Sequence, residues 1–194
     1  MAVARPTLGL LGGVFDPPHV GHLALARAGI EQLELERLLV LVVENPGHKR
    51  STTSPATRLE LASLAFEELP GAQVELDPHP RTVDSLEACS PKDAVFLVGS
   101  DELAGFPQWK NPERVLELVR LGVAMRPGVP YGRLREARTR FPAPDRISYF
   151  EMQPVPVSST DIRNRVAQGE SIDELVPPKV AEAIARLGLY RHAE

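Results

Sequence analysis

The stretch Gly12–His22, GGVFDPPHVGH, decides the fold prediction for this chain. It follows Thr7–Leu11, an apolar run of strand length, and it leads into His22–Leu33, where apolar residues recur every three or four positions, as on one face of a helix. Glycines at a strand-to-helix turn let the backbone bend sharply and approach a ligand, and the free N–H groups of a helix N-terminus favour an anion. The sequence therefore predicts a phosphate-binding turn built on Gly12 and Gly13 after a first strand.

Two histidines support this prediction. His19 and His22 are one helical turn apart, so they share a helix face and can both donate hydrogen bonds to phosphate oxygens. A metal site or a solvated pair is the alternative, but a metal usually needs more than two histidine ligands, and no HExxH or CxxC pattern supplies others. The chain lacks GxxxxGK[ST], and no GxGxxG follows the first strand, which argues against P-loop and dinucleotide-reductase functions.

Apolar runs of strand length alternate with helical patterns along the rest of the chain. Further strands are expected at Leu38–Val43, Gln73–Asp77, Ala94–Val98, Gly122–Met125 and Ile147–Met152. Helices are expected after the cap Ser54–Pro55, at Pro112–Arg120, weakly at Leu134–Arg140, from a capping box at Ser171–Glu174, and at Pro178–Leu187 before Gly188. This alternation predicts a single doubly wound, Rossmann-like α/β domain with a parallel sheet over residues 1–194, and a small helical C-terminal cap over about residues 158–194.

Composition narrows the function classes. The 194 residues are 43% hydrophobic and 25% charged, as in a globular protein, and a net charge of −4 argues against a broad nucleic-acid-binding surface. The single cysteine, Cys89, excludes an intramolecular disulfide framework, and no apolar run approaches the length of a membrane span. We therefore expect a cytoplasmic protein without a nucleic-acid or membrane partner, whereas a homo-oligomer stays open.

The motifs resemble those of a known superfamily. GGVFDPPHVGH is similar to the HxGH-type signature of the nucleotidyltransferases, and Ser158–Arg163, SSTDIR, is similar to their second signature, ISSTxIR. The bacterial nicotinate-nucleotide adenylyltransferases have further segments in the same order as Pro46–Arg50 (PGHKR), Arg58, Thr82–Leu86 (TVDSL), Gly99–Asp101 with Trp109 (GSD and W) and Val176–Tyr190 (VPPKVAEAIARLGLY). The resemblance to this family covers nearly the whole chain.

That resemblance implies transfer of the adenylyl group of ATP to nicotinate mononucleotide, which yields deamido-NAD and pyrophosphate and uses Mg²⁺ together with the ATP. It implies that the reaction is carried by His19, His22, Lys49 and Arg163. The residues implied to contact ATP are these histidines and Arg163 together with Gly12, Gly13, Val14, Phe15, Gly99, Asp101, Arg126, Ser158 and Ser159. The residues implied to contact the acceptor are Asp16, His48, Lys49, Arg50, Thr82, Asp84, Asp101 and Trp109. No protein ligand to a metal is expected.

Some of these residues have simpler interpretations. Lys49 could be a solvated loop charge, and Trp109 could be an ordinary buried side chain. Asp101 could be the N-cap of a helical turn at Glu102–Gly105. The chain also departs from the family pattern, because Val14 stands where serine or threonine is usual, so one hydroxyl that could touch the phosphates is missing.

The sequence is also compatible with parts of three other functions. An enzyme of the same type could use nicotinamide mononucleotide or another phosphate acceptor such as phosphopantetheine. The carboxylate and the carboxamide cannot be told apart here, because a site that recognises this group through backbone N–H groups leaves no side-chain trace in a sequence. A nucleotide-binding module with reduced turnover is motivated by Val14 and by the few lysines. A class I aminoacyl-tRNA synthetase also has paired histidines at this position, but 194 residues leave no room for a usual anticodon-binding domain.

Overall fold

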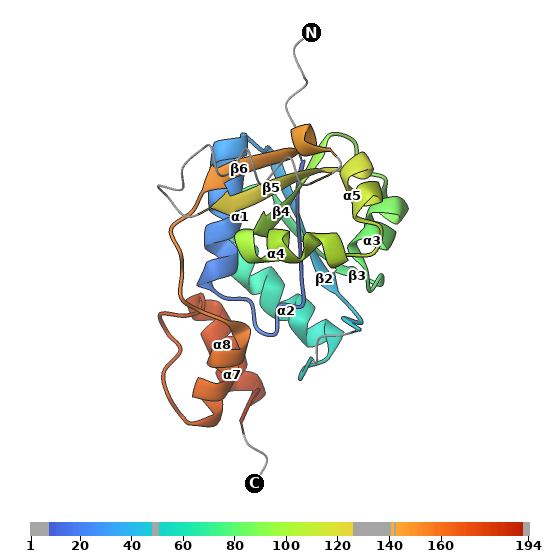
Figure 1. Cartoon of the computed structure of the whole chain (residues 1–194). Helices are drawn as coiled ribbons and strands as arrows, with labels where there is room; N and C mark the ends of the chain where they lie inside the picture. The colour runs from blue at the N-terminus through green and yellow to red at the C-terminus, as the bar shows by residue number, and fades with distance from the viewer. Residues whose placement is uncertain (1–7, 48–50, 126–140, 142, 192–194) are drawn as a thin grey trace.

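A computed structural model describes residues 8–47, 51–125, 141 and 143–191 (Figure 1). Six parallel strands form one sheet in the order β3-β2-β1-β4-β5-β6. The strands are β1 (Leu8–Gly13), β2 (Arg37–Val43), β3 (Ala72–Asp77), β4 (Ala94–Gly99), β5 (Arg120–Met125) and β6 (Ile147–Glu151). This order confirms the predicted doubly wound, Rossmann-like fold, and it reverses between β1 and β4, where such sheets bind ligands.

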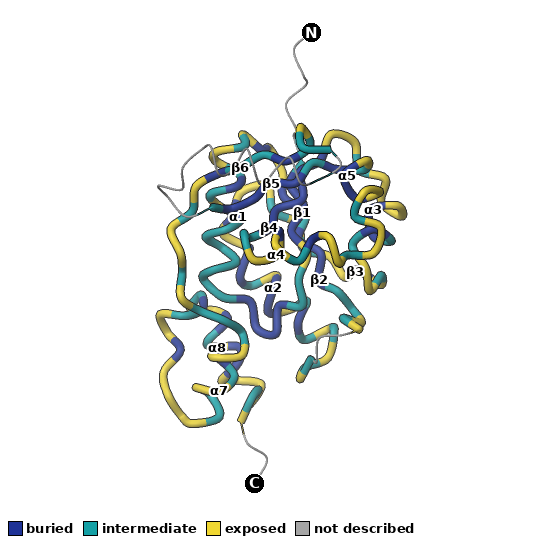
Figure 2. Tube along the Cα trace, viewed as in Figure 1, coloured by how far each residue is buried: buried dark blue, intermediate teal, exposed yellow. Residues whose placement is uncertain are grey.

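Helices pack on both faces of this sheet (Figure 1). The helices among the described residues are α1 (Val20–Leu33), α2 (Pro55–Phe66), α3 (Thr82–Cys89), α4 (Ser100–Gly105), α5 (Pro112–Leu118), α7 (Ser159–Ala167) and α8 (Pro178–Leu187), with 3₁₀ turns at Phe106–Gln108 and Pro144–Arg146. One part of the buried core takes side chains from α1, α2, α7 and α8, and the other takes them from α3, α4 and α5. Figure 2 shows the buried chain concentrated along the strands between these helices.

The strand β4 shows why the central runs of the sequence are continuously apolar. Val95 and Leu97 belong to the core on one face of the sheet, whereas Phe96 and Val98 belong to the core on the other. Successive side chains of a strand point to opposite faces, so a strand covered on both sides needs an apolar residue at every position. The same continuously apolar pattern made β2 predictable. Strand β4 ends at Gly99, at the edge of the sheet where the strand order reverses between β1 and β4.

Two helix boundaries differ from the sequence prediction. Helix α1 begins at Val20 instead of His22, because His19 has the extended backbone of an N-cap. Helix α5 ends at Leu118 and not at residue 120, because Val119 is extended and Arg120 already pairs with β4. An apolar run that crosses directly from helix to strand gives no glycine or proline to mark the boundary.

Further corrections concern short elements. Helix α3 was not predicted, although its residues were noted for their resemblance to a family segment. The predicted capping box at Ser171–Glu174 is wrong, since no helix begins there and the Ser171 hydroxyl accepts from the Asp173 N–H at 3.3 Å in a turn. The predicted helix Leu134–Arg140 lies outside the described residues.

The C-terminal part of the chain follows the prediction in its two helices. Ser158 caps α7, and α8 ends at Leu187 with Gly188 as its C-cap, whose φ of +62° lies in the left-handed region that glycine adopts easily. None of the helices in the described parts of the chain combines the length and apolarity needed to cross a membrane.

Candidate active site

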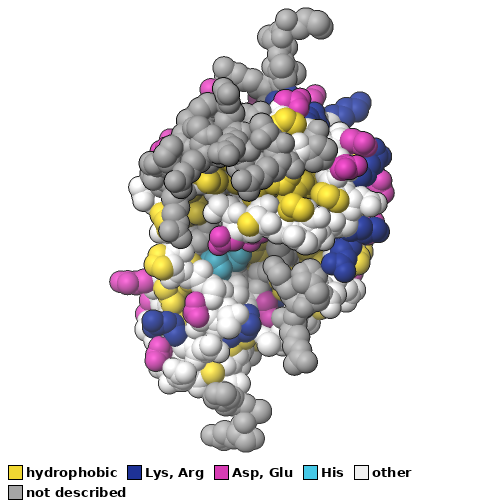
Figure 3. Space-filling model, viewed as in Figure 1, with side chains coloured by type: hydrophobic (Ala, Val, Ile, Leu, Met, Phe, Trp, Pro, Cys, Tyr) yellow, Lys and Arg dark blue, Asp and Glu magenta, His cyan; other side chains and the backbone are white. Residues whose placement is uncertain are grey.

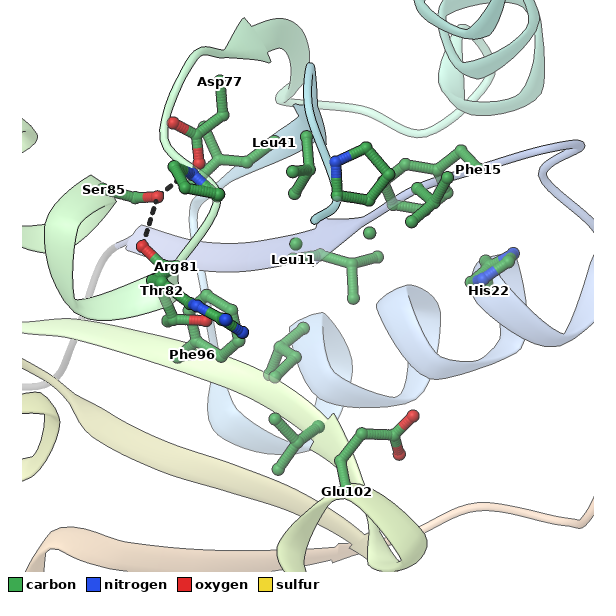
Figure 4. Close-up of a pocket in the computed structure, with 18 of the residues that line it drawn as sticks. Leu11, Phe15, His22, Leu41, Asp77, Arg81, Thr82, Ser85, Phe96 and Glu102 are labelled. Carbon is green, nitrogen blue, oxygen red and sulfur yellow. Dashed lines mark hydrogen bonds between the residues drawn. The ribbon is translucent and has the colours of Figure 1, made fainter. Parts of the chain in front are cut away.

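A pocket of about 1240 Å³ opens at the carboxyl ends of β1 and β4. Its walls also include the β3–α3 connection, the segment around Trp109 and the first turn of α7. Figure 4 shows His22 at one end of this pocket and Asp77, Arg81 and Ser85 at the other. Histidine side chains are also visible at the surface in a hollow below a band of hydrophobic side chains (Figure 3). The pocket therefore lies where the strand order predicts a ligand.

The turn after β1 is built differently from the sequence prediction. Gly12 and Gly13 are the last residues of the strand, and the left-handed backbone conformation falls on Phe15, with φ of +53°. The glycines are needed for packing: a Cβ on Gly13 would lie 2.8 Å from Phe15 Cζ, and one on Gly12 would lie 3.1 Å from Phe96 Cζ. The prediction that the two glycines make the bend is wrong, although both still line the pocket.

The side chain of His22 is fixed by its neighbours. Its Nδ1 accepts a hydrogen bond from the His19 N–H at 3.2 Å, and its ring meets that of Phe15 edge-on with centroids 4.9 Å apart. Because Nδ1 acts as an acceptor, the proton of the neutral ring lies on Nε2. His22 thus offers an N–H donor from the first turn of α1, where the helix dipole already favours an anion.

His19 stands behind His22 instead of lining the pocket. Its ring stacks on that of His22 with centroids 3.7 Å apart, and its Nδ1 is buried without a hydrogen-bond partner among the described residues. Burial lowers the pKa of His19 from 6.5 to about 4, so the imidazole is neutral at pH 7. The structure therefore brings the two predicted histidines together but gives only His22 a place in the pocket wall.

The partly buried imidazole of His19 makes stability depend on pH. A histidine whose pKa is about 4 when folded and 6.5 when unfolded binds more protons in the unfolded state between these values, so the free energy of unfolding falls as pH drops through that window. Between pH 7 and pH 4, we expect the free energy of unfolding of His19→Gln to fall by about 1–3 kcal/mol less than that of wild type. Urea unfolding at both pH values measures the difference, and equal losses in the two proteins would contradict it.

The second signature is fastened to the first by hydrogen bonds to the main chain. Ser159 Oγ donates to the Pro17 carbonyl at 2.8 Å, and Arg163 donates to the Asp16 carbonyl, also at 2.8 Å. Both side chains line the pocket, whereas Ser158 does not: its hydroxyl accepts from the Asp161 N–H at 3.1 Å and so caps α7. The two motifs that the sequence separates by about 140 residues thus form one wall.

The carboxylate of Asp16 holds three segments of the chain together. It accepts from the Thr52 N–H at 2.6 Å and from the Thr53 hydroxyl at 2.8 Å, and Tyr190 OH donates to it at 2.7 Å. Burial by itself would raise the pKa of Asp16, but these hydrogen bonds outweigh it and the pKa is lowered. The carboxylate is therefore ionised at neutral pH and occupied by the protein itself, and its predicted contact with the acceptor stays a prediction.

Sequence reasoning assigned no role to Arg58, which is 1% exposed. Its guanidinium donates to the carbonyls of Val14 at 3.0 Å, Val43 at 2.6 Å and Glu44 at 2.8 Å. These carbonyls follow β1 and end β2, so one side chain ties the pocket turn to the neighbouring strand. Burial lowers the pKa of Arg58 and the charge of Asp16 offsets part of this. The resemblance to the adenylyltransferases includes Arg58, but no local pattern in the sequence indicates that its side chain is buried or which carbonyls it contacts.

The other end of the pocket contains the predicted Trp109 and Thr82. Trp109 is half-buried and meets Phe106 and Phe96 edge-on, with centroids 5.2 Å and 6.1 Å apart, so it is both a packed residue and part of the pocket wall. Thr82 is the first residue of α3. Asp84 faces away from this role, since its carboxylate pairs with Lys110 at 2.6 Å and it is not among the lining residues.

Of the predicted residues near the end of β4, some line the pocket and others do not. Gly99 and Val14 line the pocket, whereas Asp101 is exposed in the first turn of α4 and does not. The N-cap of α4 is Gly99, so the alternative interpretation of Asp101 as a cap is wrong. Glu102, which no sequence motif indicates, lines the pocket, and its Oε2 would lie 2.6 Å from a Cβ at Gly99.

Four predicted residues cannot be placed: His48, Lys49, Arg50 and Arg126 lie outside the described residues. Within the described ranges no three His, Cys, Asp or Glu side chains are grouped to hold a metal ion. The donors that the pocket wall does contain, the His22 imidazole and the Arg163 guanidinium, suit phosphate oxygens.

Comparison with known proteins agrees with this geometry. Residues 10–165 match the cytidylyltransferase-like family. The chain is 41% identical to a probable nicotinate-nucleotide adenylyltransferase of Thermomicrobium roseum, over 96% of this chain and 92% of the relative, and 37% identical to one of Exiguobacterium sibiricum, over 94% and 98%.

A solved structure with the same fold extends the comparison. The nicotinic acid mononucleotide adenylyltransferase of Plasmodium falciparum superimposes with a TM-score of 0.73 at 16% identity, covering 94% of this chain and 96% of that one. The two sequence signatures, the strand order and these relatives lead to one conclusion: the chain belongs to the cytidylyltransferase-like family and, within it, to the nicotinate-nucleotide adenylyltransferases.

Proposed function

We propose that this protein transfers the adenylyl group of ATP to nicotinate mononucleotide, with release of pyrophosphate and formation of deamido-NAD. The observation that carries the proposal is the shared pocket wall of His22, Ser159 and Arg163, which gathers an imidazole and a guanidinium as donors beside two helix N-termini, with Ser159 joining the two motifs. Relatives at 41% and 37% identity with this name support the choice of reaction.

Adenylyl transfer requires the protein to bring two polyanions together and to stabilise the negative charge that develops on the phosphate oxygens during the reaction. A phosphate oxygen of the acceptor attacks the α-phosphorus of ATP in line with the departing pyrophosphate, and positioning with electrostatic stabilisation supplies most of the rate. His22 donates from Nε2 to the oxygens that gain charge, while Arg163 and the first turn of α7 hold the leaving phosphates. Mg²⁺ bound to the ATP would neutralise part of the phosphate charge.

The acceptor end suits a flat ring. Trp109 has its indole partly exposed in the pocket wall, and its edge-on contacts with Phe96 and Phe106 fix the plane of the ring. A pyridine ring can stack on such a face. The N-terminus of α3 at Thr82 lies on the same part of the pocket and favours a negatively charged substituent.

The direct test is pyrophosphate release by the purified protein with ATP, Mg²⁺ and nicotinate mononucleotide, in parallel with nicotinamide mononucleotide. We expect release with the nicotinate form and a higher kcat/KM than with the amide. A higher kcat/KM with nicotinamide mononucleotide would contradict the proposed acceptor and identify the amide form as the substrate.

A nucleotide-binding module with reduced turnover is the second candidate, because Val14 removes a hydroxyl from the pocket wall. Calorimetric binding of ATP without any pyrophosphate above that of a His22→Ala control would favour the module over the enzyme.

A further inference from the structure

Tyr190, which follows α8, has an unusual backbone conformation. Its φ of +62° lies in the left-handed region, which glycine adopts easily and a bulky residue rarely does. Gly188, two residues earlier, has the same φ without strain because it lacks a Cβ. A residue with a large side chain keeps such a conformation only where its surroundings determine it, and this kind of strain is concentrated at functional residues. The contacts of the Tyr190 side chain therefore have to hold this backbone.

The phenol of Tyr190 adds to a set of donors around the carboxylate of Asp16. Its hydroxyl donates to Asp16 Oδ1 at 2.7 Å. The other donors that the described residues supply come from the short segment 51–53, and they include the Thr52 N–H at 2.6 Å and the Thr53 hydroxyl at 2.8 Å. Burial raises the pKa of Tyr190 and the charge of Asp16 raises it further, so the phenol keeps its proton at neutral pH. Tyr190 thus acts as a donor that ties the carboxylate to the C-terminal helices.

Asp16 also anchors the guanidinium of Arg163. The Asp16 carbonyl oxygen accepts from Arg163 at 2.8 Å, and a second nitrogen of Arg163 donates to the Thr160 hydroxyl at 3.2 Å. The positive charge of Arg163 offsets part of the rise in the pKa of Tyr190 that burial causes, because both side chains approach the same residue. Asp16 therefore contacts Tyr190 through its carboxylate and Arg163 through its carbonyl.

Helix α8 sets the position from which the phenol approaches Asp16. Its buried side chains belong to the same apolar cluster as those of α2. At the surface, Arg186 of α8 pairs with Glu60 of α2 at 2.6 Å, and Lys179 pairs with Glu67. Residues 51–53 lead into α2, so the segment that shares the Asp16 carboxylate with Tyr190 precedes the helix on which α8 packs. The C-terminal part of the chain and the turn after β1 are thus joined at Asp16.

We infer that Tyr190 is a positioning residue for adenylyl transfer, which holds Asp16 so that the Asp16 carbonyl keeps the guanidinium of Arg163 on the pocket wall. Asp16 and Arg163 line the pocket and Tyr190 does not, so Tyr190 acts through Asp16 and not by contact with a substrate. The inference rests on the proposed function, in which Arg163 holds the phosphates that leave as pyrophosphate. A guanidinium that is already held in position loses less freedom when it binds phosphate oxygens, and so binds them more tightly.

The test is a double-mutant cycle between Tyr190 and Arg163. Tyr190→Phe removes the hydroxyl and keeps the ring that packs against the apolar cluster. Arg163→Ala removes the group through which Tyr190 is inferred to act. Two quantities are measured for wild type, the two single variants and the double variant: kcat for pyrophosphate release, and the Kd of inorganic pyrophosphate with Mg²⁺ by calorimetry.

We expect Tyr190→Phe to lower kcat about tenfold and to raise the Kd of pyrophosphate by a similar factor, while KM for nicotinate mononucleotide changes little. In the Arg163→Ala background the same substitution should change neither kcat nor Kd, because the group that Tyr190 positions is already gone. A tyrosine with a purely structural role would not show this dependence on Arg163.

Two further variants make the result specific. Tyr149→Phe is the matched control, because it removes a phenolic hydroxyl from β6, outside the pocket wall, and it should leave kcat and Kd unchanged. Thr53→Val removes the neighbouring donor on Asp16 Oδ1 and should shift both quantities in the same direction as Tyr190→Phe. Thr53→Val also takes the place of Tyr190→Phe in the cycle if that variant does not fold, as judged by far-ultraviolet circular dichroism.

The outcomes separate this inference from the proposed function. Wild-type kcat and Kd in Tyr190→Phe would overturn the inference while the reaction stands, and so would an equal loss with and without Arg163. If wild type releases no pyrophosphate with either mononucleotide, the proposed function fails. The Kd values for pyrophosphate then still decide whether Tyr190 positions Arg163 toward a bound anion.

Discussion

A His22→Ala variant is expected to lose about 10²- to 10³-fold in kcat for adenylyl transfer, while KM for the acceptor changes little. The reason is the place of Nε2: it is a preorganised donor at the start of α1, in the pocket wall, with the ring held between His19 and Phe15. A donor fixed in this way strengthens its interaction as phosphate oxygens gain charge in the transition state. Steady-state rates of pyrophosphate release at saturating ATP and Mg²⁺ measure the loss.

The control is Arg27→Ala, which truncates an exposed side chain on the same helix outside the pocket wall. It should retain wild-type kcat, and both variants should show similar far-ultraviolet circular dichroism. A His22→Ala protein with more than a third of wild-type kcat would remove His22 from the reaction and leave the α1 N-terminus as the main anion-binding group at that end.

The largest expected effect on stability comes from Arg58. Arg58→Met should reduce the free energy of unfolding by about 3–5 kcal/mol, because it keeps much of the side-chain volume but leaves the carbonyls of Val14, Val43 and Glu44 without their donor in a buried place. It also removes a positive charge near the buried carboxylate of Asp16. Urea denaturation at pH 7 and 25 °C measures the change.

The same substitution at Arg114 provides the matched control. That guanidinium is exposed and pairs with Glu87 and Glu117, so Arg114→Met should lower the free energy of unfolding far less than Arg58→Met does. Arg58→Lys keeps a charge but cannot reach three carbonyls in the same geometry, and we expect an intermediate loss. If Arg58→Met and Arg114→Met were equally stable, the hydrogen bonds to the pocket turn would contribute nothing to folding.

The predictability of the fold followed from burial on both faces of the sheet. The runs in β2 and β4 are continuously apolar, and a strand followed by a helical pattern recurs along the chain, so the parallel arrangement could be predicted. Helix α3 could not, because it has eight residues and an arginine at its N-cap, which gives none of the usual start signals.

The parts of the candidate site that lie within short sequence motifs were predictable. The strand-to-helix turn with its paired histidines could be identified from residue types, and SSTDIR could be identified from its resemblance to the second nucleotidyltransferase signature. The different roles of residues within the first motif could not be identified. The left-handed backbone conformation lies on Phe15, and the ring of His19 stacks on that of His22 without lining the pocket. The contacts of Ser159 with Pro17, and of Arg58 with Val14, join residues 142 and 44 positions apart, and no periodicity reports such distances.

The hydrogen bond between Tyr190 and Asp16 has a consequence for how the protein is made. The partners are 174 positions apart, so a ribosome that adds about 5–20 residues per second reaches Tyr190 roughly 9–35 s after Asp16. During that time β1 and the neighbouring strands can already pair, but the turn that follows β1 lacks one of its anchors. The last adjustment of the turn after β1 therefore waits until Tyr190 has been synthesised, and it is made on strands that can already have paired.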